Sequence, residues 1–374
     1  MLKRIFIDNY KSLINFEIKL NNLNLFLGRN GSGKSAIFEV LDQIRRFVYL
    51  GEDAGSVFPI EHKTRWSSLS YQKFELEFQG HEGIFKYELS LKHSEAEQNV
   101  KVRYERLFYE GNPLLKLEEK GEVHLFRDDF SHGPVYPVNL SLSAVGAIPP
   151  RNDNTLLTWF KNRIKHLIVL QIIPPMMSLE SSKEAENPFK YLTNFTSWYR
   201  YLSQDQGLAF QLISELKNVI PGFYAFKFES VGEKHRLLKV AIQNEEDKQI
   251  VEYTFDELSD GQRMLISLYT ILVLMRLSHN SRYILCLDEP ENFLALEEIQ
   301  PWLTELYDIC ENGHTQAILI SHHPELIDYL LADPVGFWFE RESNRATRIK
   351  SITIPENKKG IPFSEIIARG WLNE

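Results

Sequence analysis

The sequence predicts a mixed α/β fold with a mostly parallel core sheet, and two observations predict it. Near the N-terminus, a short apolar run at residues 23–27 leads through a glycine-rich turn into the helical periodicity of residues 36–49. After residue 250, strand and helix patterns alternate, as is typical of a parallel sheet covered by helices. We therefore expect one core that is assembled from both ends of the chain.

The residues between these two parts predict an insertion of a different kind. Apolar and polar residues alternate over residues 74–126 with glycines between the runs, which predicts an antiparallel meander. Residues 154–220 have a helical pattern broken by prolines, and the absence of sustained heptads excludes a long coiled-coil arm there. Further strands are expected at 223–228, 237–242, 250–255, 283–287 and 317–320, with helices from 261, near 296–310 and after Pro324.

These patterns divide the chain into three parts. Residues 1–50 and 250–374 are expected to form the split core, and residues 51–150 an inserted antiparallel β lobe. Residues 151–249 are expected to form a helical and strand insertion that includes a short helical lobe.

Composition restricts the compartment and the partners. The net charge of −9 argues against a protein that coats nucleic acid by bulk attraction. Two cysteines, Cys286 and Cys310, do not make a disulfide framework, so a reducing cytoplasm is expected. The most apolar stretch, residues 265–277, is shorter than the roughly 20 residues that cross a bilayer, so no membrane association is expected.

The glycine-rich turn carries the strongest motif. Residues 28–35, Gly-Arg-Asn-Gly-Ser-Gly-Lys-Ser, match the phosphate-binding pattern G-x-x-x-x-G-K-S between a strand and a helix. Such a loop points backbone N–H groups at phosphate oxygens, with Lys34 on the β- and γ-phosphates and Ser35 on Mg²⁺. The nucleotide-binding residues predicted by this pattern are Gly28, Asn30, Gly31, Ser32, Gly33, Lys34 and Ser35.

A second apolar strand, residues 283–287, ends in two adjacent carboxylates. Asp288 and Glu289 in this place resemble a Walker B strand followed by a catalytic glutamate. Asp288 would face the Mg²⁺ shell, and Glu289 would polarise the attacking water. A strand that simply ends in an acidic turn is the alternative, and the presence of the loop 28–35 favours the catalytic interpretation.

Two shorter segments add to this pattern. Residues 258–262, Leu-Ser-Asp-Gly-Gln, resemble the ABC signature L-S-G-G-Q, although Ser259 also suits a plain helix N-cap. His322 follows Ser321 at the end of another apolar strand, where ABC proteins carry a histidine that senses the γ-phosphate. A histidine at a strand end is otherwise a capping or surface residue.

With these four motifs in this order, the chain resembles the ABC-class ATPases. The opening residues 6–12, the long separation of Ser35 from Leu258, and the Asp-Glu-Pro-Glu run from Asp288 are similar to the soluble SMC, RecF and OLD group. This resemblance implies an ABC-type P-loop NTPase head with ATP and Mg²⁺, and a homodimer or higher homo-oligomer that holds ATP between two heads. The residues it implies are catalytic Glu289, His322 and Lys34, metal-binding Ser35 and Asp288, and Ser259, Gly261 and Gln262 acting in trans.

Two features depart from that group. Ala295 stands where the group usually carries Asp or His, so communication between two ATP sites would be weaker. The residues after His323 are too few for the TOPRIM nuclease domain that many OLD proteins carry, so a nuclease would be a separate partner. Gln72 matches the glutamine of the Q-loop on position alone and is not assigned to it.

Two biological functions follow from the resemblance. In the first, the chain is the sensor or scaffold of a bacterial defence system and controls a separate nuclease or effector. In the second, it is a RecF- or SMC-like ATPase that binds DNA in repair or recombination. The basic residues Lys161, Arg163, Lys165 and His166, with Arg45 and Arg46, would meet DNA phosphates, or they form a solvated helix face. The acidic net charge favours the first function.

Overall fold

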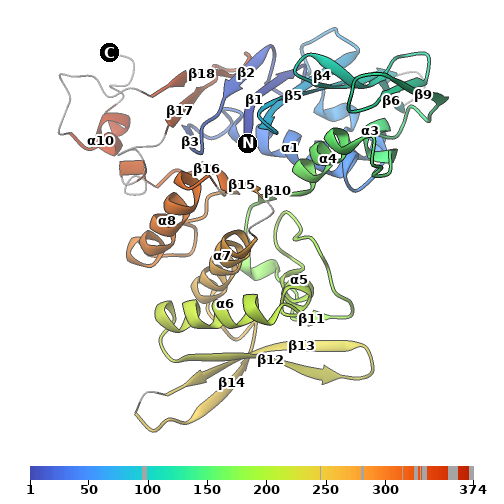
Figure 1. Cartoon of the computed structure of the whole chain (residues 1–374). Helices are drawn as coiled ribbons and strands as arrows, with labels where there is room; N and C mark the ends of the chain where they lie inside the picture. Colours follow the sequence, from blue (N-terminus) through green and yellow to red (C-terminus); the bar gives the residue numbers. More distant parts are fainter. Residues whose placement is uncertain are drawn as a thin grey trace. The chain divides into compact units, whose positions relative to one another are not determined.

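The structure of the protein, a computed structural model, describes residues 1–94, 99–244, 246–278, 282–313, 315–323, 327–328, 330, 335–352 and 361–369 (Figure 1). The described residues fall into two compact units. The first unit is drawn from Met1–Val169, Tyr283–Leu285 and Leu331–Ile361, and the second from Leu170–Arg282, Cys286–Leu330 and Pro362–Glu374. The mixed α/β fold is confirmed, while the three-part division of the chain stays a prediction.

The first unit contains a large antiparallel sheet and a smaller group of strands. Its strands are β1 (Leu2–Asp8), β2 (Phe16–Lys19), β3 (Leu23–Gly28), β4 (Tyr71–Gly80), β5 (Gly83–Ser94), β6 (Asn99–Tyr109), β7 (Asn112–Leu117), β8 (Glu122–Phe126), β9 (His132–Pro137), β17 (Val335–Glu340) and β18 (Arg348–Ser351). Its helical segments are α1 (Lys34–Val48), α2 (Ala54–Val57), η1 (Ile60–His62), α3 (Ala144–Ala147) and α4 (Thr155–Lys165).

The predicted meander is confirmed and is longer than expected. The large sheet has the strand order β2-β1-β4-β5-β6-β7-β8-β9, and its neighbours pair antiparallel. The strands β1 and β2 come from the segment expected in the core. They join the meander because Ile5 and Ile7 are fully buried and pair in register with Leu76 and Phe74. Alternation of this kind buries one face of a strand.

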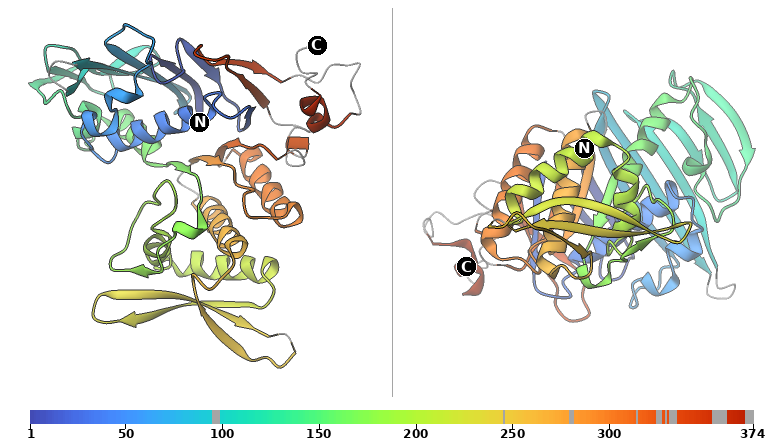
Figure 2. Two further views of the ribbon diagram at one scale, coloured as in Figure 1. Left: turned by 180° about the vertical axis from the view of Figure 1, so that it is seen from behind. Right: turned by 90° about the horizontal axis from the view of Figure 1, so that it is seen from below.

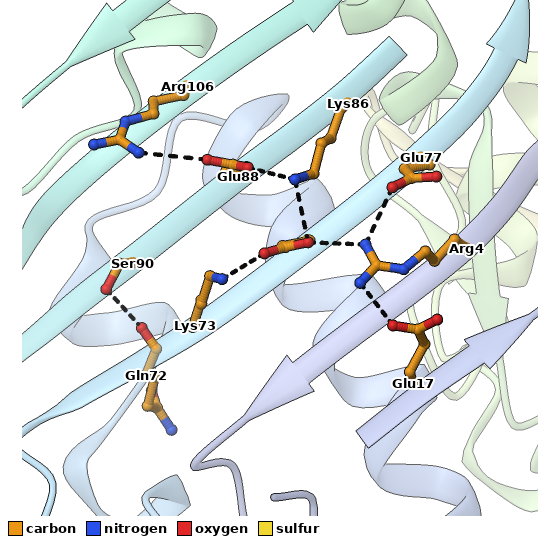
Figure 3. A network of polar contacts seen from close by, with 10 residues as sticks. Arg4, Glu17, Gln72, Lys73, Glu77, Lys86, Glu88, Ser90 and Arg106 are labelled. Carbon is orange, nitrogen blue, oxygen red and sulfur yellow. Dashed lines mark hydrogen bonds and ion pairs between the residues drawn. The ribbon is translucent and has the colours of Figure 1, made fainter. Parts of the chain in front are cut away.

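A charged network stabilises the other face of this sheet (Figure 3). The Arg4 guanidinium contacts Glu75 at 2.8 Å and Glu17 at 2.7 Å, which joins strands β4, β1 and β2. Lys73 and Lys86 also pair with the Glu75 carboxylate. Burial alone would raise the pKa of Glu75, but the hydrogen bonds from Arg4 and Lys73 outweigh it and lower the pKa to about 2.

The strand that precedes the phosphate-binding loop is buried along its whole length. The strand β3 pairs in parallel with β17, and β17 pairs antiparallel with β18. Phe26 on β3 contacts Phe38 on α1, with ring centroids 6.1 Å apart, and Phe339 on β17 at 4.9 Å. These contacts fix the start of α1 against β3, as the sequence predicted for a strand–loop–helix unit.

The second unit combines helices with a small antiparallel sheet. Its elements are η2 (Pro174–Met176), β11 (Glu180–Ser181), α5 (Phe195–Leu202), α6 (Gln206–Val219), β12 (Phe223–Val231), β13 (His235–Gln243), β14 (Ile250–Thr254), α7 (Asp260–Leu277), α8 (Leu296–Glu311), β16 (Thr315–Ile320) and α10 (Phe363–Ala368). The strand β13 pairs with β11, β12 and β14, and α6 packs on this sheet through β12 (Figures 1 and 2).

The helix α7 is the centre of the second unit. It contacts α6 and α8, and most of its side chains are buried. The Trp302 indole on α8 donates to the Leu268 carbonyl at 2.9 Å, and Arg276 pairs with Glu215 on α6 and Glu305 on α8. The signature segment at the N-terminus of α7 is therefore attached to a rigid helix.

Two strands, β10 (Leu167–Leu170) and β15 (Tyr283–Asp288), cross from one unit to the other. They are neighbours in a sheet, and β15 continues beside β16 in the second unit. The strand β10 falls in a region predicted to be helical, and the helix expected after Pro324 lies mostly outside the described residues. Among the residues that the structure describes, no helix is long and apolar enough to span a membrane.

Candidate functional site

The backbone of the loop 28–35 requires glycine at two positions. Gly28 has φ +140°, and a Cβ atom there would lie 2.3 Å from the Phe339 carbonyl oxygen. Gly33 has φ +103°, and its Cβ would lie 2.5 Å from Thr347 Oγ1. A side chain at either position would meet both a steric clash and an unfavourable φ. The motif glycines therefore make the sharp turn into α1.

The lysine and serines of the motif surround the start of α1. Lys34 is buried, and its Nζ donates to the carbonyls of Gly28 at 2.7 Å and Arg29 at 3.2 Å. Gly33 is the N-cap and supplies no side-chain acceptor to the first turn, while Ser35 is exposed. A helix N-terminus with this geometry favours an anion such as phosphate.

A short chain of hydrogen-bonded hydroxyl groups, which the sequence does not predict, contacts the backbone of the loop. Ser12 Oγ and Thr347 Oγ1 lie 2.8 Å apart, and Thr347 donates to the Ser32 carbonyl at 2.8 Å. Arg341 donates to the Gly31 carbonyl at 3.3 Å. No local pattern predicts these contacts, because Thr347 and Arg341 are more than 300 positions from the loop.

In the second unit, Asp288 and Glu289 at the end of β15 differ in burial and in backbone conformation. Asp288 is buried, with 9% of its surface exposed. Glu289 has φ +52°, and its N–H donates to the Ile320 carbonyl on β16 at 2.9 Å. This turn separates the two neighbouring side chains, so that Asp288 ends the strand and Glu289 begins a loop.

The Glu289 carboxylate is held by two neighbours. Asn292 Nδ2 donates to Glu289 Oε2 at 2.8 Å, and His322 Nε2 lies 3.5 Å from Glu289 Oε1. The structure therefore brings the predicted base and the predicted sensor histidine together. The roles assigned to them remain predictions.

Glu291 supplies a third carboxylate, which is buried close to Glu289 and His322. Its Oε1 accepts hydrogen bonds from Ser321 Oγ at 2.6 Å and from the His322 N–H at 3.3 Å. Burial raises the pKa of Glu291, and the hydrogen bonds from Ser321 and His322 oppose that shift. The sequence analysis noted Glu291 only as part of a resemblance and gave it no role.

The signature segment caps a helix, as the simpler interpretation predicted. Ser259 Oγ accepts from the Gln262 N–H at 3.2 Å, and Gln262 Oε1 accepts from the Ser259 N–H at 3.0 Å. This is a capping box. A Cβ at Gly261 would lie 3.0 Å from the Phe293 carbonyl, so the segment after Glu291 runs close to the start of α7. A contact in trans remains a prediction.

Ala295 is the N-cap of α8 and supplies no side-chain acceptor. Its N–H donates to Glu298 Oε2 at 2.8 Å, which is half of a capping box. The departure from the usual Asp or His therefore leaves this helix without its first side-chain cap.

Gln72, Lys161 and Arg163 make their contacts within the first unit. Gln72 is fully buried on β4, donates to the Asn9 carbonyl and accepts from His93 Nε2 at 2.9 Å. Lys161 Nζ donates to the carbonyls of Gly146 and Ile148, and Arg163 lies over the Trp159 ring at 5.2 Å. Neither Lys161 nor Arg163 is a solvated helix residue, so this part of the basic run gives no support to a DNA groove.

No group of three or more His, Cys, Asp or Glu side chains within the described ranges is arranged to hold a metal ion. Mg²⁺ usually takes one or two protein ligands and completes its shell with phosphates and water. In the first unit, Ser32 is buried beside the α1 N-terminus, and its Oγ has no hydrogen-bond partner in the described part of the chain, which leaves a donor for a bound anion.

Comparison with known proteins gives a family and a likeness to solved structures. A family model described as "AAA domain, putative AbiEii toxin, Type IV TA system" matches residues 23–328. Among solved structures, the chain is similar to an SMC head domain from Thermotoga maritima, at 15% identity and a TM-score of 0.49, over 94% of this chain and 99% of that one. The comparison with curated proteins gave no match. The matched residues include all four motifs.

Proposed function

The chain belongs to the AAA-domain family of nucleotide-binding ATPases whose model matches residues 23–328, and from this premise we propose that it binds and hydrolyses Mg-ATP. The observation that carries the proposal is the loop 28–35, with glycines at positive φ and a buried Lys34 at the start of α1. This is the geometry that holds phosphate on backbone N–H groups.

The proposed reaction assigns one task to each group. Lys34 binds the β- and γ-phosphates, and Ser35 and Asp288 hold Mg²⁺. When bound, Mg²⁺ neutralises the charge of the phosphates. Glu289 orients a water molecule and accepts its proton on a carboxylate oxygen, while His322 at 3.5 Å steadies that carboxylate.

The Glu289→Gln variant tests this assignment. It keeps the size of the side chain but removes the base, so kcat should fall at least about 100-fold while ATP still binds. Glu297→Gln, which makes the same change at an exposed position in the first turn of α8, should hydrolyse ATP as the wild type does. Equal rates for wild type and Glu289→Gln would refute the role of Glu289.

The biological output that we propose is control of a separate partner. The family description names a toxin of a type IV toxin–antitoxin system, which supports a place in a bacterial defence or toxin-like module. In such a module this chain would be the sensor or scaffold for a separate nuclease or effector. A nuclease gene beside the gene for this chain would support that function. Stimulation of the ATPase by DNA would instead favour the alternative, a RecF- or SMC-like ATPase of repair or recombination.

A further inference from the structure

Glu291 joins two segments that carry the proposed catalytic groups. It is 8% exposed, and one oxygen, Oε1, accepts from both Ser321 Oγ and the His322 N–H. The Glu291 backbone carbonyl also accepts from the Leu294 N–H at 3.1 Å. A single buried residue therefore holds the turn that follows β15 to the turn that follows β16.

The hydroxyl of Ser321 extends this connection. Ser321 is fully buried, and its Oγ accepts from the His323 N–H at 3.1 Å while it donates to Glu291. The backbone from Ser321 to His323 is thus fixed at both the His322 and the His323 amides. The imidazole of His322 projects from this fixed backbone toward Glu289.

The neighbouring carboxylates have different surroundings. Glu289 is partly exposed, and Asn292 Nδ2 and His322 Nε2 lie near its two oxygens. Glu291 faces inward, and its Oε2 is buried with no hydrogen-bond partner among the described residues. Burying a carboxyl group costs free energy. The hydrogen bonds to Glu291 Oε1 come from Ser321 and His322, in the turn that carries the His322 imidazole.

We propose that Glu291 is a positioning residue that sets the separation between Glu289 and His322 without contacting the nucleotide. This inference rests on the proposed ATPase function for its consequence in catalysis. A catalytic group that moves by about 1 Å can lose about 100-fold in rate, so a fixed turn has a measurable effect. The residues proposed to bind the phosphates lie in the loop 28–35 and not in this turn, so the effect should fall mainly on kcat.

Steady-state ATPase rates of the full chain with Mg-ATP test the proposal. Glu291→Ala should lower kcat by about 10- to 100-fold and change the KM for ATP by less than about 3-fold. Glu291→Gln keeps an acceptor at Oε1 and should stay within about 5-fold of wild type. Ser321→Ala added to Glu291→Ala should cost less than Ser321→Ala costs in the wild type, because the bond between Ser321 and Glu291 is then already lost and only the bond from the His323 N–H remains to be removed. Glu297→Ala is the control.

Amide hydrogen exchange measures the same turn without any hydrolysis. In Glu291→Ala, the His322 and His323 amides should exchange at least about 10-fold faster than in wild type, and in Glu291→Gln or Glu297→Ala they should not. Unchanged exchange in Glu291→Ala would overturn the proposal, as would a kcat equal to wild type or a Glu291→Gln variant as slow as Glu291→Ala. A wild-type chain that does not hydrolyse ATP would refute the proposed function, while exchange would still decide the role of Glu291.

Discussion

At the scale of single residues, the loop 28–35 is held by contacts from distant parts of the chain, at Arg341 and Thr347. The spacing of the motif predicts Lys34 and the glycines of the loop, because phosphate binding needs them at fixed positions. Glu289 and His322 are predicted in the same way, and the structure places them 3.5 Å apart. The hydroxyl chain from Ser12 to Thr347 carries no such spacing, since serine and threonine have many uses in any sequence.

Gln72, which matches the Q-loop glutamine on position alone, lies on β4 beside a buried histidine. Its neighbour His93 is buried, donates through Nε2 to Gln72, and has no partner on Nδ1 among the described residues. Protonation of Nδ1 would bury a charged donor. Burial, with a smaller contribution from Lys63, therefore lowers the pKa of His93 to about 4.

This lowered pKa predicts how stability depends on pH. Between about pH 6.5 and pH 4 the unfolded chain binds a proton at His93 and the folded chain does not, so stability falls as the pH falls. From pH 7 to pH 5, His93 should account for a loss of about 1–2 kcal/mol. His93→Gln should remove that part of the loss in urea unfolding. His124→Gln, at an exposed position on β8, should lose as much stability between pH 7 and pH 5 as the wild type does. If His93→Gln loses the same amount, burial of His93 is not the cause.

At the scale of elements, strongly patterned segments were predicted well. The helix α1 and the strands β4 to β8 lie where periodicity placed them. The strand β10 was missed, because its four apolar residues follow the helix α4 directly and a short apolar run does not distinguish strand from helix. The pairing of β17 with β3 could not be predicted either, because no local pattern indicates which distant strand will lie next to β3.

The start of α8 offers a prediction at this scale. Ala295 has φ −75° and ψ 156°, the extended conformation of an N-cap, but it has no side-chain acceptor. Ala295→Ser would supply one without adding charge and should raise the free energy of unfolding by about 0.5–1 kcal/mol. Urea unfolding measures this change. Ala295→Val, which adds bulk but no acceptor, should give no gain, and a gain equal to that of the serine would mean that capping is not the cause.

At the scale of the whole molecule, the signature segment leads to the proposed association of two copies. Ser259 is exposed at the N-terminus of α7, where it forms a capping box with Gln262. An N-terminus of this kind attracts a phosphate group. If it meets the γ-phosphate bound to a second copy, ATP should link the two chains, and each site would be completed only in the dimer.

Mass in solution, measured by light scattering on the Glu289→Gln variant, tests this association. Mg-ATP should convert the monomer to a dimer, and the added variant Ser259→Arg should prevent the conversion by blocking the approach of phosphate. Ser214→Arg adds the same bulk at an exposed position on α6, so it should still dimerise. A mass that ATP leaves unchanged would exclude the ATP-linked dimer, and dimerisation of Ser259→Arg would place the contact elsewhere. Because hydrolysis is stalled by Glu289→Gln, the result separates assembly from turnover.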